Sequence, residues 1–274
     1  MTTPLIANPA AFREQYGPWA VIAGASDGTG EQFAHQLAAT GLNCVLVSRR
    51  QGVLEELGSN LEKTHGVETR VVVLDLSLPS AGQQLCKAVA DLEVGLFVSN
   101  AGADTAGQVF AEGSLDTWHK LINMNIHNPM DACHILMQPM IERGHGGLLL
   151  MGSGQAIGGQ PRTGVYSACK GFSLNLCEAM WTELKPLGVD VLNVVAPLMH
   201  TPTLQRTLGD LVDKIPGVLH ADDVVRVSLE QLNIGPIHIF PTGIPGDDAE
   251  AIMAARKGRI DNVLQLAKVM FDAG

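Results

Sequence analysis

The sequence has few aromatic residues and no long hydrophobic run. Aromatic residues make up 4% of the 274 positions and charged residues 17%, while hydrophobic residues reach 46%, as is typical of a globular protein with a large core. The longest apolar run, GLLLMG at 147–152, is far shorter than the roughly 20 residues that cross a bilayer. We therefore expect no membrane segment, and the length fits one large domain or two small ones.

Basic residues are scarce as well. The formal net charge is −10 and the longest basic cluster is SRR at 48–50, which argues against a nucleic-acid partner. The amino-terminal residues show neither a basic start nor a sustained apolar stretch, so we expect no secretory signal. The five cysteines are odd in number and form no C-x-x-C pair, which predicts reduced thiols in the cytoplasm and no metal site.

What the chain does contain is a regular alternation of short apolar runs with longer helical patterns. Each run is continuously apolar, as expected for strands buried on both faces of a parallel sheet. There is no linker and no internal repeat, so we predict one domain over 1–274, built on a doubly wound α/β sheet of about seven parallel strands. The predicted strands are 19–23, 43–48, 69–74, 95–100, 147–152, 190–196 and 236–240.

The segments between the strands have recognisable ends. The stretch 31–41 carries an apolar stripe that stops at Gly41, a natural helix terminator. Ser114 is a good amino-terminal cap, and Pro129 and Pro139 predict a kink or break in the helix that follows it. The other segments are predicted as a helix over 165–186, an amino-terminal lead over 1–17, a mobile lid above an apolar pocket at 197–219 and a helical tail over 246–274.

Three glycines follow the first predicted strand, in the sequence GASDGTG at 24–30. Gly24 would turn the chain off the strand, Gly28 would let the backbone approach a pyrophosphate, and Gly30 would open a helix whose amides face the anion. A plain strand-to-helix turn can have the same composition. The loop alone therefore leaves a phosphate-binding loop and an ordinary turn as alternatives.

The end of the second predicted strand bears on the choice of cofactor. A carboxylate there would bind the ribose 2′-hydroxyl of NAD, but the chain has Ser48 followed by Arg49 and Arg50. Two guanidinium groups can bind a 2′-phosphate through paired hydrogen bonds, so NADP(H) is favoured over NAD(H). Asp27 in the glycine loop weighs against a 2′-phosphate, and both arginines could instead be solvated residues at a helix start.

Tyr166 and Lys170 lie four residues apart near the start of a predicted helix, so their side chains share a face. A phenol has an ordinary pKa of about 10, and a neighbouring ammonium lowers that pKa toward the range of a working acid or base. Ser153 follows the fifth strand. Because the carboxyl ends of parallel strands line one crevice, we expect Ser153, the Tyr166 helix and the Gly24 loop to face one cleft. An ordinary surface lysine on an amphipathic helix is the alternative.

Taken in order, these motifs resemble those of the short-chain dehydrogenase/reductase family. The resemblance runs from Trp19 to about Phe240, which is nearly the whole chain. Each motif is weak alone, but the ordered set is highly specific, and the glycine spacing of the first loop is the family's own. The motifs are Gly24-x-x-x-Gly28-x-Gly30, Asp75-Leu76, Asn100-Ala101-Gly102, Asn125, Ser153 and Tyr166-x-x-x-Lys170.

The resemblance implies a Rossmann-like fold and a role for each motif residue. Tyr166 would be the general acid in ketone reduction and the base in alcohol oxidation, and Lys170 would bind the nicotinamide ribose and depress the pKa of Tyr166. Ser153 would hydrogen-bond the substrate oxygen, and Asn125 would hold the helix geometry and a water beside Lys170. Other substrate contacts are expected from Gln155, Leu198 and His200. The cofactor would be bound by Gly24, Ser26, Asp27, Gly28, Thr29, Gly30, Arg49, Arg50, Asp75, Leu76, Asn100, Ala101, Gly102, Tyr166, Lys170, Pro197 and Thr201.

The chain departs from the family pattern after the sixth strand, where Pro197-Leu198 stands in place of Pro-Gly. The leucine would narrow the pocket or make it more apolar. The stretch YGPWAVIAGASDGTG at 16–30 is similar to the start of family members that reduce steroid or long-chain 3-ketoacyl substrates. This resemblance implies a steroid-, aryl- or acyl-like ketone or secondary alcohol as the small-molecule substrate. The resemblance also implies a homodimer or homotetramer, in which the helices at 114–143 and 165–186 pair across subunits.

Two other functions stay open beside an NADP(H)-dependent ketone reductase. One is a non-catalytic member of the same fold that only binds the cofactor, and the other is an NAD-dependent alcohol dehydrogenase. The intact Tyr166, Lys170 and Ser153 argue against the first. The related sugar-nucleotide epimerase branch needs a substrate domain for which this chain is too short.

Overall fold

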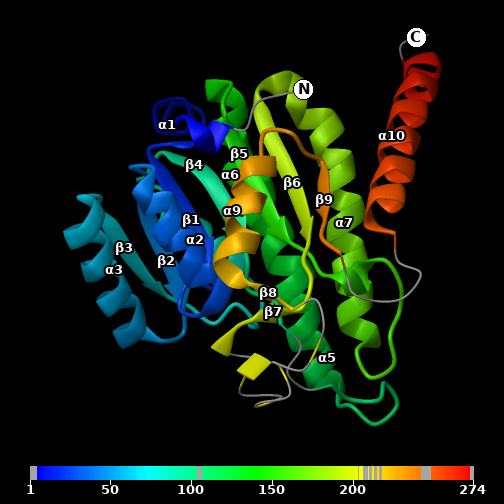
Figure 1. Cartoon of the computed structure of the whole chain (residues 1–274), viewed down its shortest axis with the longest axis horizontal. Coiled ribbons are helices and arrows are strands. Elements are labelled where there is room, and N and C mark those ends of the chain that lie inside the picture. Colours follow the sequence, from blue (N-terminus) through cyan, green and yellow to red (C-terminus); the bar gives the residue numbers. More distant parts are fainter. Residues whose placement is uncertain are drawn as a thin grey trace.

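In the computed structural model, seven strands form one parallel sheet in the order β3-β2-β1-β4-β5-β6-β9, and the order reverses between β1 and β4 (Figure 1). Sheets of this kind bind ligands at that reversal, beyond the carboxyl ends of the strands. The structure describes residues 5–103, 107–202, 204–205, 209, 212, 215, 218–241 and 248–271. The strands are β1 (Trp19–Ala23), β2 (Asn43–Ser48), β3 (Thr69–Val73), β4 (Val94–Ser99), β5 (Gly146–Met151), β6 (Val189–Val195) and β9 (Ile237–Ile239).

All seven predicted strands are confirmed, and each boundary agrees with the prediction to within one residue. The reason is visible in their burial, since every residue of β4, β5 and β6 is buried. Only strands covered on both faces need such continuous apolar runs. The edge strand β3 is less buried, and Val73 at its end is 50% exposed.

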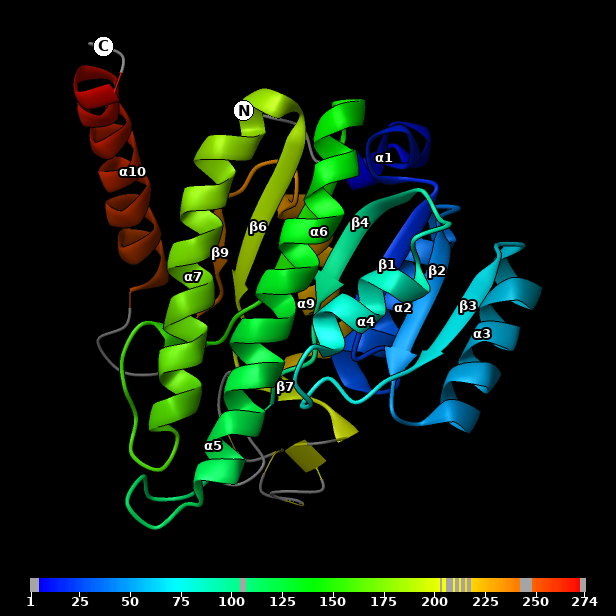
Figure 2. The same ribbon diagram turned by 180° about the vertical axis from the view of Figure 1, so that it is seen from behind.

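Helices cover both faces of the sheet, as the two opposite views show (Figures 1 and 2). One face packs against a core that includes Phe33, Leu54 and Leu229, and the other against a core that includes Leu85, Leu136 and Leu184. The first face carries α1 (Pro9–Tyr16), α2 (Gly28–Ala39), α3 (Gln51–His65) and α9 (Ala221–Gln231). The second carries α4 (Ala81–Ala88), α6 (Asn128–Arg143) and α7 (Gly164–Leu184), with α5 (Leu115–Ile122) running into α6.

In the amino-terminal lead, helix α1 packs into the core of the sheet. Phe12 and Tyr16 are fully buried. The Tyr16 hydroxyl donates to Oδ2 of Asp190 at 2.7 Å, and Nζ of Lys185 donates to Oδ1 of the same carboxylate at 2.6 Å. Burial and the Asp190 charge raise the pKa of Tyr16 well above its ordinary value. Hydrogen bonds to a charged group contribute about 1.5–3 kcal/mol each, so this network ties α1 firmly to β6.

The helix expected over 114–144 is interrupted, but the break does not lie at either proline. Ser114 caps α5 as predicted, with its Oγ accepting from the Thr117 amide at 3.1 Å. Between α5 and α6 the chain makes one π-helical turn over Asn123–His127. Pro129 then stands in the first turn of α6, where a missing N–H costs nothing, and Pro139 is accommodated inside α6. Asn125 lies in this π-helical turn.

Two predictions for the carboxyl-terminal part concern the lid and the tail. Most of 203–217 lies outside the described residues, so the predicted mobility of the lid is not addressed there. The ends of that stretch are joined, because β7 (Met199–His200) pairs in parallel with β8 (Leu219–His220). The tail forms α10 (Ala249–Phe271), which runs beside α7 (Figure 1). Arg256 of α10 donates from Nε to Oε1 of Glu178 on α7 at 2.5 Å. No helix within the described ranges is long and apolar enough to cross a membrane.

Candidate active site

A cleft of about 730 Å³ opens beyond the carboxyl ends of the central strands. All but three of the residues predicted for the site line it, and they come from segments spread between positions 24 and 201. The three that do not are Gly30, Asn125 and His200. The predicted residues that line the cleft are Gly24, Ser26, Asp27, Gly28, Thr29, Arg49, Arg50, Asp75, Leu76, Asn100, Ala101, Gly102, Ser153, Gln155, Tyr166, Lys170, Pro197, Leu198 and Thr201.

The glycine loop is a tight backbone cradle between β1 and α2. Gly24 adopts a left-handed φ of +85°, and a side chain there would press on the backbone of Ala101. Gly30 lies beneath the loop, where a Cβ would overlap the carbonyl oxygen of Gly24. Gly30 therefore permits the close packing of the loop without lining the cleft itself. Asp27 precedes α2 and its side chain makes no capping hydrogen bond.

These features fit the diphosphate of a dinucleotide. The first amides of an α-helix have no carbonyl partner one full turn back, and at α2 the Asp27 side chain does not cap them, although the Gly30 amide donates to the Asp27 carbonyl at 3.2 Å. A helix start with free amides and a positive dipole end is suited to an anion. Gly28 also has a left-handed φ, of +55°, a conformation that favours a residue without a side chain of its own. The residues present therefore fit a bound pyrophosphate group.

Asn100 fastens the glycine loop to the end of β4. Its Nδ2 donates to the carbonyl oxygen of Gly24 at 3.1 Å, and its Oδ1 accepts from the Thr29 hydroxyl at 2.6 Å. The backbone amide of Ala101 donates to Ala23 at 2.9 Å. The loop after β4 and the loop after β1 are thus held as one unit across the reversal in strand order.

The two arginines after β2 are held differently. Arg50 points into the glycine loop, where its Nε donates to the Ser26 hydroxyl at 3.1 Å and its Nη2 lies 3.5 Å from the Asp27 carboxylate. Arg49 is 73% exposed and has one loose ion pair, with Asp75 at 3.8 Å. The Asp27 carboxylate, which the sequence placed against a 2′-phosphate, is therefore paired with Arg50. Arg49 is the cation more available to bind an anion in the cleft.

Asp75 keeps its negative charge at the far end of the cleft. Burial alone would raise its pKa, but hydrogen bonds from the hydroxyl and amide of Ser77, together with the Arg49 and Lys120 charges, lower it. Ser77 donates to Oδ1 from its hydroxyl at 2.7 Å and from its amide at 2.9 Å. The Asp75 side chain is thus fixed by its own loop.

Lys170 is the most deeply buried cation of the site, with 5% exposure. Its Nζ donates to the carbonyl oxygen of Met151 at 2.7 Å and lies 5.4 Å from the centre of the Tyr166 ring. Burial lowers the pKa of Lys170 to about 8. The predicted shared face of Tyr166 and Lys170 is present, and the lysine is a buried group rather than a surface one.

Asn125 approaches Lys170 from the π-helical turn. Its Nδ2 donates to the Leu121 carbonyl at 2.9 Å, while its Oδ1 is buried without a hydrogen-bond partner among the described residues. A Cβ on Gly102 would overlap this Oδ1 and would come within 3.0 Å of Nζ of Lys170. The glycine at 102 therefore lets the asparagine carbonyl and the ammonium share one small space. An orphaned acceptor there suits a bound water or a ligand hydroxyl.

Ser153 stands at the end of β5 and caps a short 3-10 helix over Gly154–Ala156. Its Oγ accepts from the Gln155 amide at 3.3 Å, and Gln155 in turn accepts from the Ser167 hydroxyl at 3.2 Å. The serine hydroxyl proton is therefore not used by this contact. Ser153 and Tyr166 both line the cleft, where one substrate oxygen can meet two hydroxyl groups.

His200, expected from the sequence as a substrate contact, does not line the cleft. It belongs to β7, and its ring stacks on that of His220 with centres 5.4 Å apart. Further residues that line the cleft were not predicted for the site, and no motif of the sequence singles them out; among them are Asp116, Thr117, Lys120, Met124, Thr163 and Leu204. Among the residues that the structure describes, no group of three or more histidines, cysteines or acids could hold a metal.

The chain was compared with known proteins. The family model for short chain dehydrogenases matches residues 18–210. The 7beta-hydroxysteroid dehydrogenase of Collinsella aerofaciens is 32% identical over 222 residues, covering 80% of each chain. The very-long-chain 3-oxoacyl-CoA reductase of Rattus norvegicus is 33% identical over 212 residues, covering 76% of this chain and 68% of the reductase.

A solved structure of a 7beta-hydroxysteroid dehydrogenase superposes with a TM-score of 0.75 at 30% identity, covering 83% of this chain and 88% of that one. The match therefore extends from the sequence to the fold. Members of this family bind NAD(P)(H) and act on CH–OH and C=O groups of small molecules. By its matched residues, its motifs and its fold, the chain belongs to the short-chain dehydrogenase/reductase family and is an oxidoreductase of that kind.

Proposed function

We propose that the protein is an NADP(H)-preferring oxidoreductase that interconverts a ketone and a secondary alcohol on an apolar substrate. The observation that carries the proposal is the meeting of Ser153, Tyr166 and buried Lys170 in the cleft that also holds the glycine loop. A protein that only bound the cofactor would have no use for all three side chains.

In this proposal each residue acts on the substrate oxygen or on its proton. A nicotinamide cofactor, when bound, supplies or accepts the hydride. Tyr166 gives its phenolic proton to the carbonyl oxygen in reduction and takes it back in oxidation. Lys170 favours the phenolate that remains, because its ammonium is buried next to the ring. Ser153 donates to the same oxygen as negative charge develops on it.

Two observations support an apolar substrate. Leu198, which stands where the family pattern has glycine, lines the cleft and is 47% exposed, so its side chain is available for contact. Met199 and Leu204 line the same region. The names of the two relatives above refer to a hydroxysteroid and to a very-long-chain 3-oxoacyl-CoA. We therefore expect a steroid-, aryl- or acyl-like ketone as substrate.

The proposal is tested with a panel of ketones and secondary alcohols of steroid, aryl and acyl types, followed by nicotinamide absorbance with NADPH, NADH and their oxidised forms. We expect turnover of bulky apolar carbonyls and little turnover of small polar ones such as acetone. A panel in which small hydrophilic carbonyls are preferred would contradict the substrate class, and no turnover at all would contradict the reductase function.

Arg49 is expected to set the preference for NADP(H). Its exposed guanidinium is the cation available to a 2′-phosphate, whereas Arg50 is held by Ser26 and Asp27. A charge-assisted hydrogen bond contributes about 1.5–3 kcal/mol, so Arg49→Ala should lower the ratio of kcat/KM for NADPH to that for NADH by roughly 10- to 100-fold. Arg70→Ala is the matched control, because Arg70 pairs with Asp91 and does not line the cleft. An unchanged ratio in Arg49→Ala would refute the role of Arg49.

We also propose a homodimer or homotetramer in the cytoplasm. Exposed apolar side chains on α5 and α6, namely Leu115, Met130 and Ile135, support an interface along these helices. Five free, buried cysteines support a reducing compartment. Light scattering on the purified protein should report two or four copies per particle, and a monomer at micromolar concentration would contradict the assembly.

A further inference from the structure

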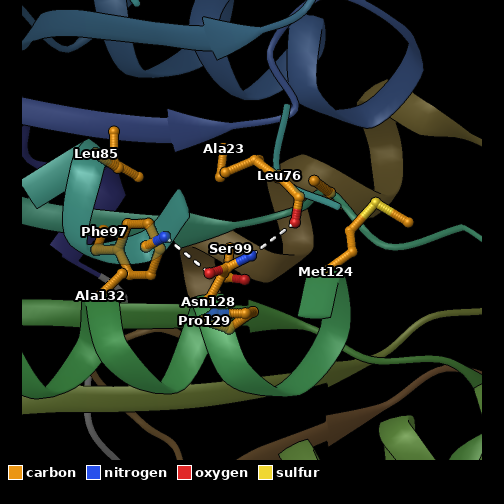
Figure 3. Close-up of a pocket in the computed structure, with 11 residues that line it drawn as sticks. Ala23, Leu76, Leu85, Phe97, Ser99, Met124, Asn128, Pro129 and Ala132 are labelled. Atoms are coloured by element: carbon orange, nitrogen blue, oxygen red, sulfur yellow. Dashed lines mark hydrogen bonds between the residues drawn. The ribbon is translucent and has the colours of Figure 1, made fainter. Parts of the chain in front are cut away.

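The loop between β3 and α4, residues 74–80, is held in place by a single side chain of α6. Asn128 is 2% exposed, and its Nδ2 donates to the carbonyl oxygens of Leu76 and Leu78, each at 2.8 Å. Its Oδ1 accepts from the Gly82 amide at 2.9 Å. Figure 3 shows Asn128 reaching from α6 toward Leu76, with dashed lines marking two of these bonds.

This geometry uses three of the four hydrogen bonds that one carboxamide can make. Both Nδ2 hydrogens and Oδ1 are engaged, so no other side chain of this size can satisfy all three backbone groups. An aspartate would set a carboxylate oxygen against two carbonyl oxygens. An alanine would leave the buried Leu76 carbonyl and Gly82 amide, and the partly buried Leu78 carbonyl, without this partner. A buried polar group without a hydrogen-bond partner lowers the stability of the fold, so position 128 requires asparagine.

A second asparagine holds the same loop from the π-helical turn. Asn123 donates from Nδ2 to the carbonyl oxygen of Ser77 at 3.1 Å. The carbonyls of three consecutive loop residues, Leu76, Ser77 and Leu78, are therefore bound by asparagines of one helical segment. Asn125, between the two asparagines in sequence, faces Lys170 instead.

The loop at 74–80 forms part of the cleft wall through residues 74–77. Leu76, Ala101 and Met124 line both the cleft and an adjoining small cavity of about 10 Å³, and Asn128 lines that cavity as well (Figure 3). The cavity has room for about one water molecule. One layer of side chains thus separates Asn128 from the cleft, so a shift of the loop moves the cleft wall directly.

We propose that Asn123 and Asn128 are positioning residues for the adenosine end of the bound cofactor. They do not touch the ligand; they fix the backbone that presents Asp75 and Leu76 to it. The inference rests on the proposed function only in taking the cleft as the NADP(H) site. The same helical segment then positions both ends of the site, because Asn128 holds the loop that carries Leu76 and Asn125 lies beside Lys170.

The test uses two halves of the cofactor as calorimetric probes of the full-length protein, namely 2′,5′-ADP and nicotinamide mononucleotide, with ADP-ribose in parallel. Asn128→Ala should weaken 2′,5′-ADP binding about tenfold and Asn123→Ala about threefold, with mononucleotide binding unchanged. The KM for NADPH should rise in proportion while kcat at saturation changes less than about twofold. Asn43→Ala is the matched control, since Asn43 accepts one backbone bond, from Glu68 at 2.9 Å, at the opposite end of the sheet.

The outcomes separate the two proposals. If the wild type binds neither 2′,5′-ADP nor ADP-ribose, the nucleotide site itself is refuted. If the wild type binds and folded Asn123→Ala and Asn128→Ala proteins bind as tightly, the positioning role is refuted and the proposed function stands. A purely structural role would lower the melting temperature of all three variants alike and leave their affinities equal. Should Asn128→Ala not fold, Asn123→Ala decides, because Asn123 is partly exposed and loses only two contacts, the Nδ2 bond to the Ser77 carbonyl and the Oδ1 contact with Nδ1 of His127 at 3.0 Å.

Discussion

Replacing Tyr166 with phenylalanine is expected to lower kcat by roughly 100- to 10,000-fold, the usual contribution of a general acid or base. The substitution removes the phenolic proton and leaves the ring, over which Nζ of Lys170 lies 5.4 Å from the centre. NADPH affinity, measured by fluorescence titration, should therefore change little. Steady-state rates of the best ketone from the panel give the measurement.

The chain offers a matched control, because it has one other tyrosine. Tyr16 is fully buried at the opposite end of the sheet, where its hydroxyl bonds Asp190. Tyr16→Phe should cost stability through that lost bond, about 1.5–3 kcal/mol, and should keep wild-type kcat. A Tyr166→Phe protein that retains more than about a tenth of wild-type kcat would show that another group moves the proton.

Replacing Lys170 with methionine is expected to lower kcat/KM for ketone reduction by about 100-fold or more. Methionine fills the buried space but removes both the ammonium beside Tyr166 and the bond to Met151. Without the cation, the phenolate left after proton transfer is no longer stabilised. Lys63→Met, at the exposed carboxyl end of α3, is the control for the loss of one positive charge.

The same residue predicts a pH dependence. Because burial lowers the pKa of Lys170 to about 8, its ammonium is present below that pH and lost above it. Wild-type kcat/KM for reduction should therefore fall as pH rises through about 8, and the residual activity of Lys170→Met should lack this decline. A wild-type profile that is flat from pH 6 to about 9.5, the range in which Lys170 would lose its proton, would contradict the assignment.

The sheet was predictable because a parallel sheet covered on both faces requires continuous apolar runs, which few other structures require. The same rule places strand ends at one edge, so Gly24, Ser153 and Tyr166 could be expected in one cleft before any coordinates. The exchange of contacts between Arg50 and Asp27 was not predictable. It depends on how the loop after β2 packs against the loop after β1.

Three other features could not be predicted from the sequence, because no local pattern of residues indicates them. The π-helical turn before Pro129 has no compositional signature, because one inserted residue changes the backbone without changing which residue types are favoured. His200 pairs with His220, a contact between two short strands that the local pattern does not reveal. Asn128 belongs to no motif, and its importance lies in three backbone partners that are distant in sequence.

The tight glycine cradle has a consequence for anyone who wishes to re-engineer cofactor choice. Positions 26, 27, 49 and 50 present side chains to the cleft and can be randomised together, with Arg50 and Asp27 exchanged as a pair. Gly24 and Gly30 are fixed by backbone atoms that a Cβ would strike, so a library that varies them is filled with clones that fail to fold. Gly28 is intermediate, because a Cβ there would come within 3.1–3.2 Å of the Thr201 side chain rather than strike backbone atoms, although its φ of +55° still favours glycine or asparagine.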